Sequence, residues 1–531
     1  MRHIEINETK RKHPFSYKLL TVLPGILALL IICIIIFGYS LFIFGDAAKH
    51  ETTSFVIATF ILVYYIRWLI RWFEYATFMI IAVFQLHQAN NHNYHNVLFA
   101  PQWLSQKDKR LKQELPKDKN AEDVIHRCMI PMVNESYEIL HDTLHALTKS
   151  NYNLARLAIT VNGEAAKKEH FLAVREKLEK KFGWIFWYFD YTLHELAADE
   201  MIGKWANITT AAEKLYQKIL THFKTTPDNI LVTTLDADTN VDKEYFSVLT
   251  YTYLITPDRK HKAYQPIIFF FNNFWQAPFF SKIISLFNSF WILFNFTKTR
   301  WTRNFSTHAQ PLDGLIETHF RSKQTIVEDG HQYRRSYFAM KGRYECVPVY
   351  AKVYQDCNLN TSVAKTADAQ YKQMRRWSHG AEDVAYSFCQ MADQRKTIPR
   401  GTTLFECIRL FESIVLRSTF HVVLLAGLFF TFFKDIQLSN YVSLGAAISL
   451  FAKFSMVLMI LIIAFQIVFC PRKQLKSRPR KVRELFKLLF AFAILVGPTL
   501  LFFSWVPALH TQIALMLGKP MKKFNVTTKV R

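Results

Sequence analysis

Long apolar runs stand at both ends of the chain, and a more polar stretch lies between them. Residues 19–44 carry no charge and are long enough for a transmembrane helix, which needs about 20 apolar residues. A second apolar stretch covers 54–87, and others follow at 415–433, 442–469 and 485–506. The pattern predicts a multi-pass membrane protein with about five spans.

Charged side chains interrupt the second stretch at Arg67, Arg71 and Glu74. A charge at the bilayer centre costs about 2.5 to 3.5 kcal/mol on insertion scales, so these residues are expected near a membrane interface. We therefore predict one span over roughly 53–69, continued by an amphipathic helix. The segment 404–417 also mixes charges with apolar residues, and we expect it to be interfacial rather than spanning.

Residues 278–298 are apolar enough to be mistaken for a further span. If they crossed the membrane, the acids before and after them would lie in different compartments. We therefore expect an aromatic, amphipathic helix at the membrane face of the central domain.

The central part alternates short β-like runs with helical patterns. Candidate strands lie at 124–133, 154–162, 183–192 and 229–238, each followed by a helix-like stretch. This alternation predicts an α/β domain with a mostly parallel, Rossmann-like sheet, inserted between N- and C-terminal transmembrane helices. Ligands of such sheets gather at the carboxyl ends of the strands. The expected organisation is a basic N-terminus (1–18), transmembrane and interfacial helices (19–88), a polar linker (89–124), the α/β domain (125–400), interfacial and transmembrane helices (401–510) and a basic tail (511–531).

The net charge of +24 raises the question of nucleic-acid binding. Seven Lys and Arg residues fall within 471–483, between two apolar segments, where the positive-inside rule explains them. We therefore expect no nucleic-acid partner, and contact with membrane lipids instead. The basic residues at 1–18 and 471–483 predict a cytosolic central domain in the cell membrane, whereas the basic tail at 519–531 does not fit the expected five spans. Seven cysteines without a CxxC pair indicate a reducing compartment.

Two acids follow the candidate strand at 229–238. The apolar run 231–235 reads as a strand buried on both faces, and Asp236 and Asp238 stand where it ends. Mg²⁺ is commonly held by one or two carboxylates together with substrate phosphates, which suits a short Asp-x-Asp. Most isolated Asp-x-Asp matches are loops or helix caps, so the preceding strand is what makes a metal site the preferred interpretation.

Several blocks occur together and in order: "CMIPMVNES" (128–136), "GKWAN" (203–207), "DAD" (236–238), "VEDGHQYRR" (327–335) and "QMRRW" (373–377). With these blocks the sequence resembles the family 2 glycosyltransferases with membrane-embedded segments, the group of cellulose, hyaluronan and chitin synthases. The continuation after Trp377 resembles an uncharacterised multi-pass sub-branch of that group. The resemblance covers roughly 125–390 and implies a GT-A fold.

The resemblance also implies roles for individual residues. Asp329, with Glu328 beside it, would be the base that deprotonates an acceptor hydroxyl. Asp236 and Asp238 would hold Mg²⁺ or Mn²⁺ on the donor diphosphate. The other implied donor contacts are Glu135, Glu164, Lys204, Asn207 and Arg376, and the implied acceptor contacts are Gln373 and Trp377.

Two departures from the family pattern stand out. Where the family carries an acidic pair after the second strand, this chain has only Asn162 or Glu164 to take its place. The Glu-Asp block begins with Val327 instead of Thr.

The stretch "HELAAD" (194–199) lacks the second His of a metal site, and an approach to the donor sugar is the alternative interpretation.

The function implied is a metal-dependent, inverting glycosyltransferase that moves a sugar from a nucleotide-diphosphate sugar, with a UDP-sugar favoured, to a glycan or lipid-linked acceptor, as in polysaccharide synthesis. The alternative is a catalytically silent subunit of a polysaccharide assembly or export complex. That alternative predicts loss of the base or metal acids, yet Asp236, Asp238 and Asp329 are all present.

Overall fold

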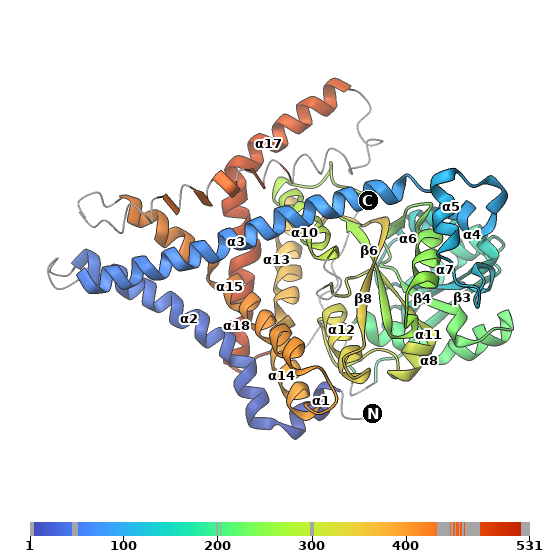
Figure 1. Cartoon of the computed structure of the whole chain (residues 1–531), viewed down its shortest axis with the longest axis horizontal. Helices are drawn as coiled ribbons and strands as arrows, with labels where there is room; N and C mark the ends of the chain where they lie inside the picture. The colour runs from blue at the N-terminus through green and yellow to red at the C-terminus, as the bar shows by residue number, and fades with distance from the viewer. Residues whose placement is uncertain are drawn as a thin grey trace.

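The structure is a computed structural model of the whole chain (Figure 1). It describes residues 5–44, 51–197, 200–201, 203–297, 302–432, a few residues between 446 and 461, and 478–521. The predicted span at 442–469, the basic loop at 471–483 and the basic tail at 519–531 lie largely outside the described residues.

A single mixed sheet forms the centre of the domain, in the strand order β3-β2-β1-β4-β7-β6-β8-β5. Neighbouring strands from β3 to β4 are parallel, β7 is antiparallel to both of its neighbours, β6 and β8 are parallel, and β5 is antiparallel to β8. The strands are β1 (Ile125–Pro131), β2 (Leu157–Glu164), β3 (Tyr188–His194), β4 (Ile230–Thr234), β5 (Asn240–Val241), β6 (Lys262–Phe269), β7 (His308–Pro311) and β8 (Glu345–Tyr354). The mostly parallel α/β sheet is confirmed, and four of its strands lie where the sequence predicts them.

Helices cover the sheet and extend far beyond it. Those of the central domain are α4 (Tyr94–Phe99), α5 (Gln106–Gln113), α6 (Tyr137–Thr148), α7 (Lys168–Phe182), α8 (Lys204–Phe223), α9 (Tyr245–Ile255), α10 (Phe279–Phe296), α11 (Leu312–Glu317), α12 (Glu328–Ala339), α13 (Val363–Ser378) and α14 (Glu382–Asp393). Towards the termini lie α1 (Ile6–Lys12), α2 (Pro14–Phe44), α3 (Glu51–Asn90), α15 (Arg400–Phe432), α17 (Arg478–Leu500) and α18 (Val506–Met516).

The central strand β4 has the composition of a strand buried on both faces. All five of its residues are buried, between parallel β1 and antiparallel β7. Leu231 belongs to the apolar core under α6 and α9, whereas Ile230 and Val232 belong to the core under α8 and α11. Both faces of β4 are covered, so the residues that follow it first become accessible at the carboxyl end of the strand. Asp236 and Asp238 stand at this end.

The long helices of both termini gather on one side of the molecule, and α3 runs from them to the sheet domain (Figure 1). Among the described residues, four helices are long and apolar enough to span a membrane, at Pro14–Phe37, Thr59–Asn90, Phe279–Phe296 and Ile494–Met516. The helix over 279–296 packs on β6, α3 and α17, and 72% of its apolar window is buried inside the protein.

The charges within the second apolar stretch are paired across two helices. Arg67 and Arg71 of α3 contact the Glu412 carboxylate of α15 at 2.7 and 2.6 Å, and Arg409 lies 3.7 Å from Glu74. Farther along α3, Gln85 hydrogen-bonds to Tyr350 of β8. The paired charges therefore stand between the apolar part of α3 and the part that packs on the sheet domain.

The segment 89–124, expected to be a polar linker, contains α4 and α5 and packs against α9. Tyr94, Val97 and Leu98 recur with the period of one helix face and are buried in the core beside α9. These three apolar residues are the signal that the overall polarity of the segment hides.

Candidate functional site

The carboxyl ends of four strands meet at one edge of the sheet. β1, β2 and β4 are parallel neighbours, and β8 points the same way because β7 reverses direction between β4 and β6. The residues just past these ends are polar: Glu135 after β1, Asp236 after β4 and Gln355 after β8, with Glu164 as the last residue of β2. This is the edge where ligands of α/β sheets bind.

Asp236 is paired with Lys204, the first residue of α8. The Lys204 ammonium lies 2.6 Å from Asp236 Oδ1 and also donates to the Ser306 carbonyl at 2.9 Å. Burial opposes the charged form of Lys204, but the nearby acids, Asp236 first and then Asp329, outweigh it, so the pKa of Lys204 is raised. The buried Gln355 amide donates to Asp236 Oδ2 at 3.2 Å and to the Thr307 hydroxyl. Both oxygens of Asp236 are thereby held in a fixed orientation.

Asp238 is more deeply placed than Asp236. It is only 3% exposed, and its Oδ2 accepts the backbone N–H of Asp356 at 3.0 Å. The Asn272 amide donates to the Asp238 carbonyl at 2.9 Å. These contacts tie the turn after β4 to the end of β8.

Glu328 and Gly203 join the starts of two helices. Glu328, the first residue of α12, accepts the Trp205 backbone N–H of α8 at 3.2 Å through its Oε1. This satisfies one of the N–H groups that a helix start leaves without a partner. A Cβ at Gly203 would come within 2.4 Å of the same Glu328 oxygen. A side chain at 203 would therefore displace the Glu328 carboxylate from its place at the start of α8.

Replacing Gly203 by Ala is expected to displace Glu328 and break its hydrogen bond to Trp205. Leaving such a buried group unsatisfied costs about 1–3 kcal/mol. Thermal unfolding in detergent should show a lower Tm. The matched control is Gly401→Ala, where the new methyl meets nothing within 4 Å in the first turn of α15 and should not lower the Tm. Equal behaviour of the two variants would contradict the close approach.

The acids of the Glu-Asp pair differ in their ionisation. Burial, and then the charge of Asp329, raises the pKa of Glu328 to about 8. Burial also raises the pKa of Asp329, but Lys204, Arg321 and Arg376 oppose the effect, and the value is about 6. Oδ1 of Asp329 is shielded from solvent and has no hydrogen-bond partner. At neutral pH this site holds a protonated Glu328 beside an ionised Asp329 that has capacity to accept a proton.

Arg376 approaches the carboxylates from α13. The charges that act on its guanidinium are those of Glu328, Asp236 and Asp329. Gln373, Arg376 and Trp377 follow at i, i+3 and i+4, so they share one helix face. Gln373 accepts from the Asn358 amide at 2.9 Å, and Trp377 is half-buried beside Arg376.

The ends of β1 and β2 supply two further acids. The Glu135 carboxylate accepts the N–H groups of Val133 and Asn134 at 2.6 and 3.1 Å, and burial raises its pKa. At the end of β2, Glu164 Oε1 accepts from the Asn207 amide of α8 at 2.9 Å. The sequence-predicted residues at 135, 164 and 207 thus lie on the same sheet edge as Asp236.

The residues present fit a divalent cation. Asp236 and Asp238 are two carboxylates, and a cationic ammonium, that of Lys204, already lies against Asp236. Within the described ranges, no group of three His, Cys, Asp or Glu side chains forms a complete metal cluster. Two carboxylates are the usual protein share of a Mg²⁺ site that substrate phosphates complete.

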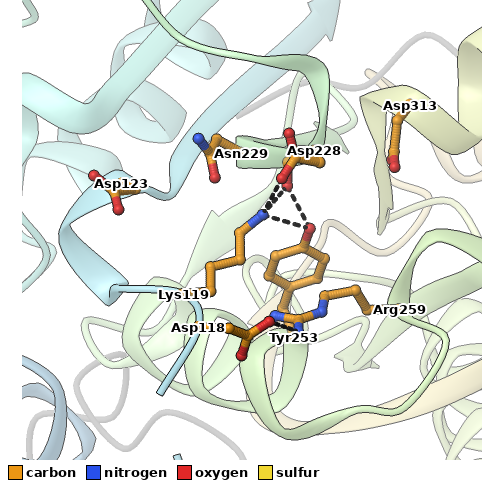
Figure 2. Close-up of a pocket in the computed structure, with 8 residues that line it drawn as sticks. All are labelled: Asp118, Lys119, Asp123, Asp228, Asn229, Tyr253, Arg259 and Asp313. Atoms are coloured by element: carbon orange, nitrogen blue, oxygen red, sulfur yellow. Dashed lines mark hydrogen bonds and ion pairs between the residues drawn. The ribbon is translucent and has the colours of Figure 1, made fainter. Parts of the chain in front are cut away.

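A cavity of about 330 Å³ lies at the opposite end of β4 (Figure 2). Asp228 and Asn229, which precede β4, line it together with Asp313, and Lys119 donates to the Asp228 carboxylate at 2.8 Å. Because it lies at the amino end of β4, whereas Asp236 follows the carboxyl end, this cavity does not belong to the candidate site.

Sequence reasoning missed Gln355, Asp356 and Ser306. The signal for the first two was available, since "AKVYQD" is an alternating strand that ends on two polar residues, as the run before Asp236 does. Ser306 contributes a backbone carbonyl, which no side-chain pattern indicates.

Comparison with known proteins gives one family. The model of "Glycosyl transferase family group 2" matches residues 231–506, more than half of the 531-residue chain. A search of the curated proteins found no significant match.

Among solved structures, the chain is similar to a mannosyltransferase from Pyrobaculum calidifontis in complex with GDP-Man and Mn²⁺, with 13% identity and a TM-score of 0.39, over 83% of this chain and 98% of that one. It is also similar to residues 1–349 of TarS of S. aureus, with 10% identity and a TM-score of 0.28, over 62% of this chain and 90% of that one. Both TM-scores are below 0.5, so the family assignment rests on the family model.

Proposed function

The chain belongs to glycosyl transferase family group 2, and from this premise we propose that it is a membrane-bound, inverting glycosyltransferase that uses a nucleotide-diphosphate sugar. The proposed acceptor is a hydroxyl of a glycan or of a lipid-linked sugar, and a UDP-sugar is the favoured donor. The single observation that carries the proposal is the convergence of Asp236, Asp329 and Arg376 from three distant segments on one electrostatic centre.

The proposed reaction is one displacement at the anomeric carbon of the donor sugar. The acceptor oxygen forms a bond to this carbon as the bond from the carbon to the diphosphate oxygen breaks, and Asp329 takes the hydroxyl proton. Attack opposite the leaving group inverts the configuration. Asp329 is favoured over Glu328 as the base because only Asp329 is mainly ionised at neutral pH.

The leaving diphosphate needs positive charge. Arg376 is proposed to bind it, with Lys204 released from Asp236 for the same purpose. Held by Asp236 and Asp238, Mg²⁺ or Mn²⁺ would supply further positive charge to that diphosphate.

The donor and acceptor are proposed to enter from different sides. Glu135, Glu164 and Asn207 lie at the ends of β1 and β2 and are proposed to contact the donor. Gln373 and Trp377 share the Arg376 face of α13 and are proposed to contact the acceptor, where an aromatic face suits a sugar ring.

The four span-like helices are compatible with a membrane protein, and we propose a cytosolic active site because nucleotide sugars are cytosolic.

The test uses the purified full-length protein in detergent with a panel of radiolabelled nucleotide sugars and Mg²⁺ or Mn²⁺. Release of nucleoside diphosphate together with label in an acceptor supports the proposal. The stereochemistry of the new bond, read by NMR, tests inversion. Absence of turnover with every donor and acceptor would contradict it.

The rate should fall on the acid side with an apparent pKa near 6. The base must be ionised, and the pKa of Asp329 is raised to about 6, so activity is present above this pH and is lost as the pH falls through it. The measurement is kcat/KM from about pH 5 to about pH 8, with enzyme returned to neutral pH as a control for unfolding. A flat profile over this range would exclude Asp329 as the base.

A further inference from the structure

One buried histidine touches two acids at once. His194, the last residue of β3, is only 2% exposed. Its Nδ1 lies 2.9 Å from Glu164 Oε2, and its Nε2 lies 2.9 Å from Glu200 Oε2. The imidazole ring therefore bridges the end of β2 and the segment that precedes α8.

These two contacts determine the protonation state of the ring. A neutral imidazole donates through only one nitrogen, and an ionised carboxylate only accepts. Both contacts are satisfied together when His194 carries both N–H groups. Burial disfavours that charge, but the hydrogen bonds that His194 donates to Glu164 and Glu200 outweigh it, and the pKa of His194 is raised.

The two acids that contact His194, Glu164 and Glu200, are each also bound to a segment of the candidate site. On one side, the second oxygen of Glu164 accepts from Asn207, in the first turn of α8. On the other side, the second oxygen of Glu200 lies 3.0 Å from the Lys323 ammonium. The Lys323 carbonyl accepts the N–H of Met201 at 2.9 Å, and the segment from 323 leads directly to Glu328 and Asp329.

We propose that His194 is a positioning residue, a buried imidazolium that holds the donor-facing Glu164 and the segment leading to the catalytic base in one fixed arrangement. This inference rests on the proposed function, since it assigns His194 a role in donor binding by that same site. The groups that face the ring are Glu164 from β2 and Glu200 from the segment before α8; Asn207 and Lys323 bind the far oxygens of these acids.

The proposal predicts an alkaline limb in the pH profile. When His194 loses its proton, one of its two contacts loses its hydrogen, and the donor KM should rise by about ten- to a hundredfold, because a hydrogen bond to a charged group is lost. His194→Gln should raise the donor KM to that level at neutral pH and remove the alkaline dependence. Glu200→Gln should move the limb to lower pH, since one of the acids that favours the imidazolium is lost.

The experiment measures kcat and donor KM from about pH 6 to about pH 10 for the full-length protein and both variants. The control is His222→Gln, an exposed histidine at the far end of α8, which should change neither quantity. An unchanged alkaline limb in His194→Gln, or an unchanged limb in Glu200→Gln, would overturn the proposal.

Direct observation of the ring separates this inference from the proposed function. Protein labelled with ¹⁵N-histidine should show an imidazolium signal that persists above the ordinary histidine pKa and disappears in His194→Gln. A neutral ring at neutral pH would overturn the inference even if the enzyme is active. Absence of any sugar transfer by the unmodified protein would instead contradict the proposed function.

Discussion

Asp329→Asn is expected to lower kcat by about a thousandfold while leaving donor binding nearly intact. A positioned general base contributes about 10²- to 10⁴-fold to a rate, and Asn keeps the shape of the side chain but cannot take a proton. Asp329 Oδ1 is buried and has no hydrogen-bond partner, so the substitution breaks no hydrogen bond of this oxygen, although it removes the negative charge that acts on Lys204 and Arg376. The effect should therefore appear in kcat and not in the Kd for nucleoside diphosphate.

The control for this variant is a second acid of the same domain. Asp313 lines the cavity at the opposite end of β4 (Figure 2), and its Oδ1 accepts the Gly314 N–H, which Asn can also accept. Asp313→Asn should retain full turnover.

The companion variant Glu328→Gln should lose far less activity than Asp329→Asn, since Glu328 is mainly protonated at neutral pH. The reverse order of effects would assign the base to Glu328.

The fold could be predicted where its signals are local. The strands at 125–131, 157–164 and 230–234 are short buried runs bounded by polar residues, and helices of amphipathic period lie between them. The reversal at β7 was not predictable, because its four residues pair with β4 and β6 across long stretches of chain. That reversal is what brings β8 into the direction of β4.

The candidate site, like the fold, could be predicted only where its residues belong to a local sequence pattern. Asp236, Glu328 and Arg376 are visible in the sequence because each belongs to a compact block, after a strand for Asp236, at a helix start for Glu328 and in the last turn of a helix for Arg376. Gln355 was missed because its role depends on the sheet order. The bridge from Glu164 through His194 to Glu200 was also missed, since its members are 30 and 6 residues apart in sequence and no local pattern predicts their contact.

Removal of divalent cations is expected to abolish turnover, with recovery on addition of Mn²⁺ or Mg²⁺. The Asp236 carboxylate is paired with the Lys204 ammonium at 2.6 Å in this structure. With the cation bound, Asp236 and Asp238 would carry it, and Lys204 would be available to the donor diphosphate. The measurement is turnover after treatment with a chelator and during back-titration with each metal. Full turnover in excess chelator would exclude a metal role.

Asp236→Asn should lower kcat/KM by about a thousandfold. Loss of one group that stabilises the charge developing in the transition state costs about 10²- to 10³-fold, and this variant weakens the cation that supplies such stabilisation by removing one of its carboxylate ligands. The remaining activity should need a higher Mn²⁺ concentration for half-saturation, which loss of the Lys204 ion pair alone does not predict.

Lys204→Met separates the two effects, since it frees Asp236 without removing a carboxylate. It should weaken donor binding yet keep or tighten half-saturation by Mn²⁺. A parallel weakening of Mn²⁺ dependence in both variants would show that the ion pair, and not a cation held by Asp236, organises this edge of the sheet.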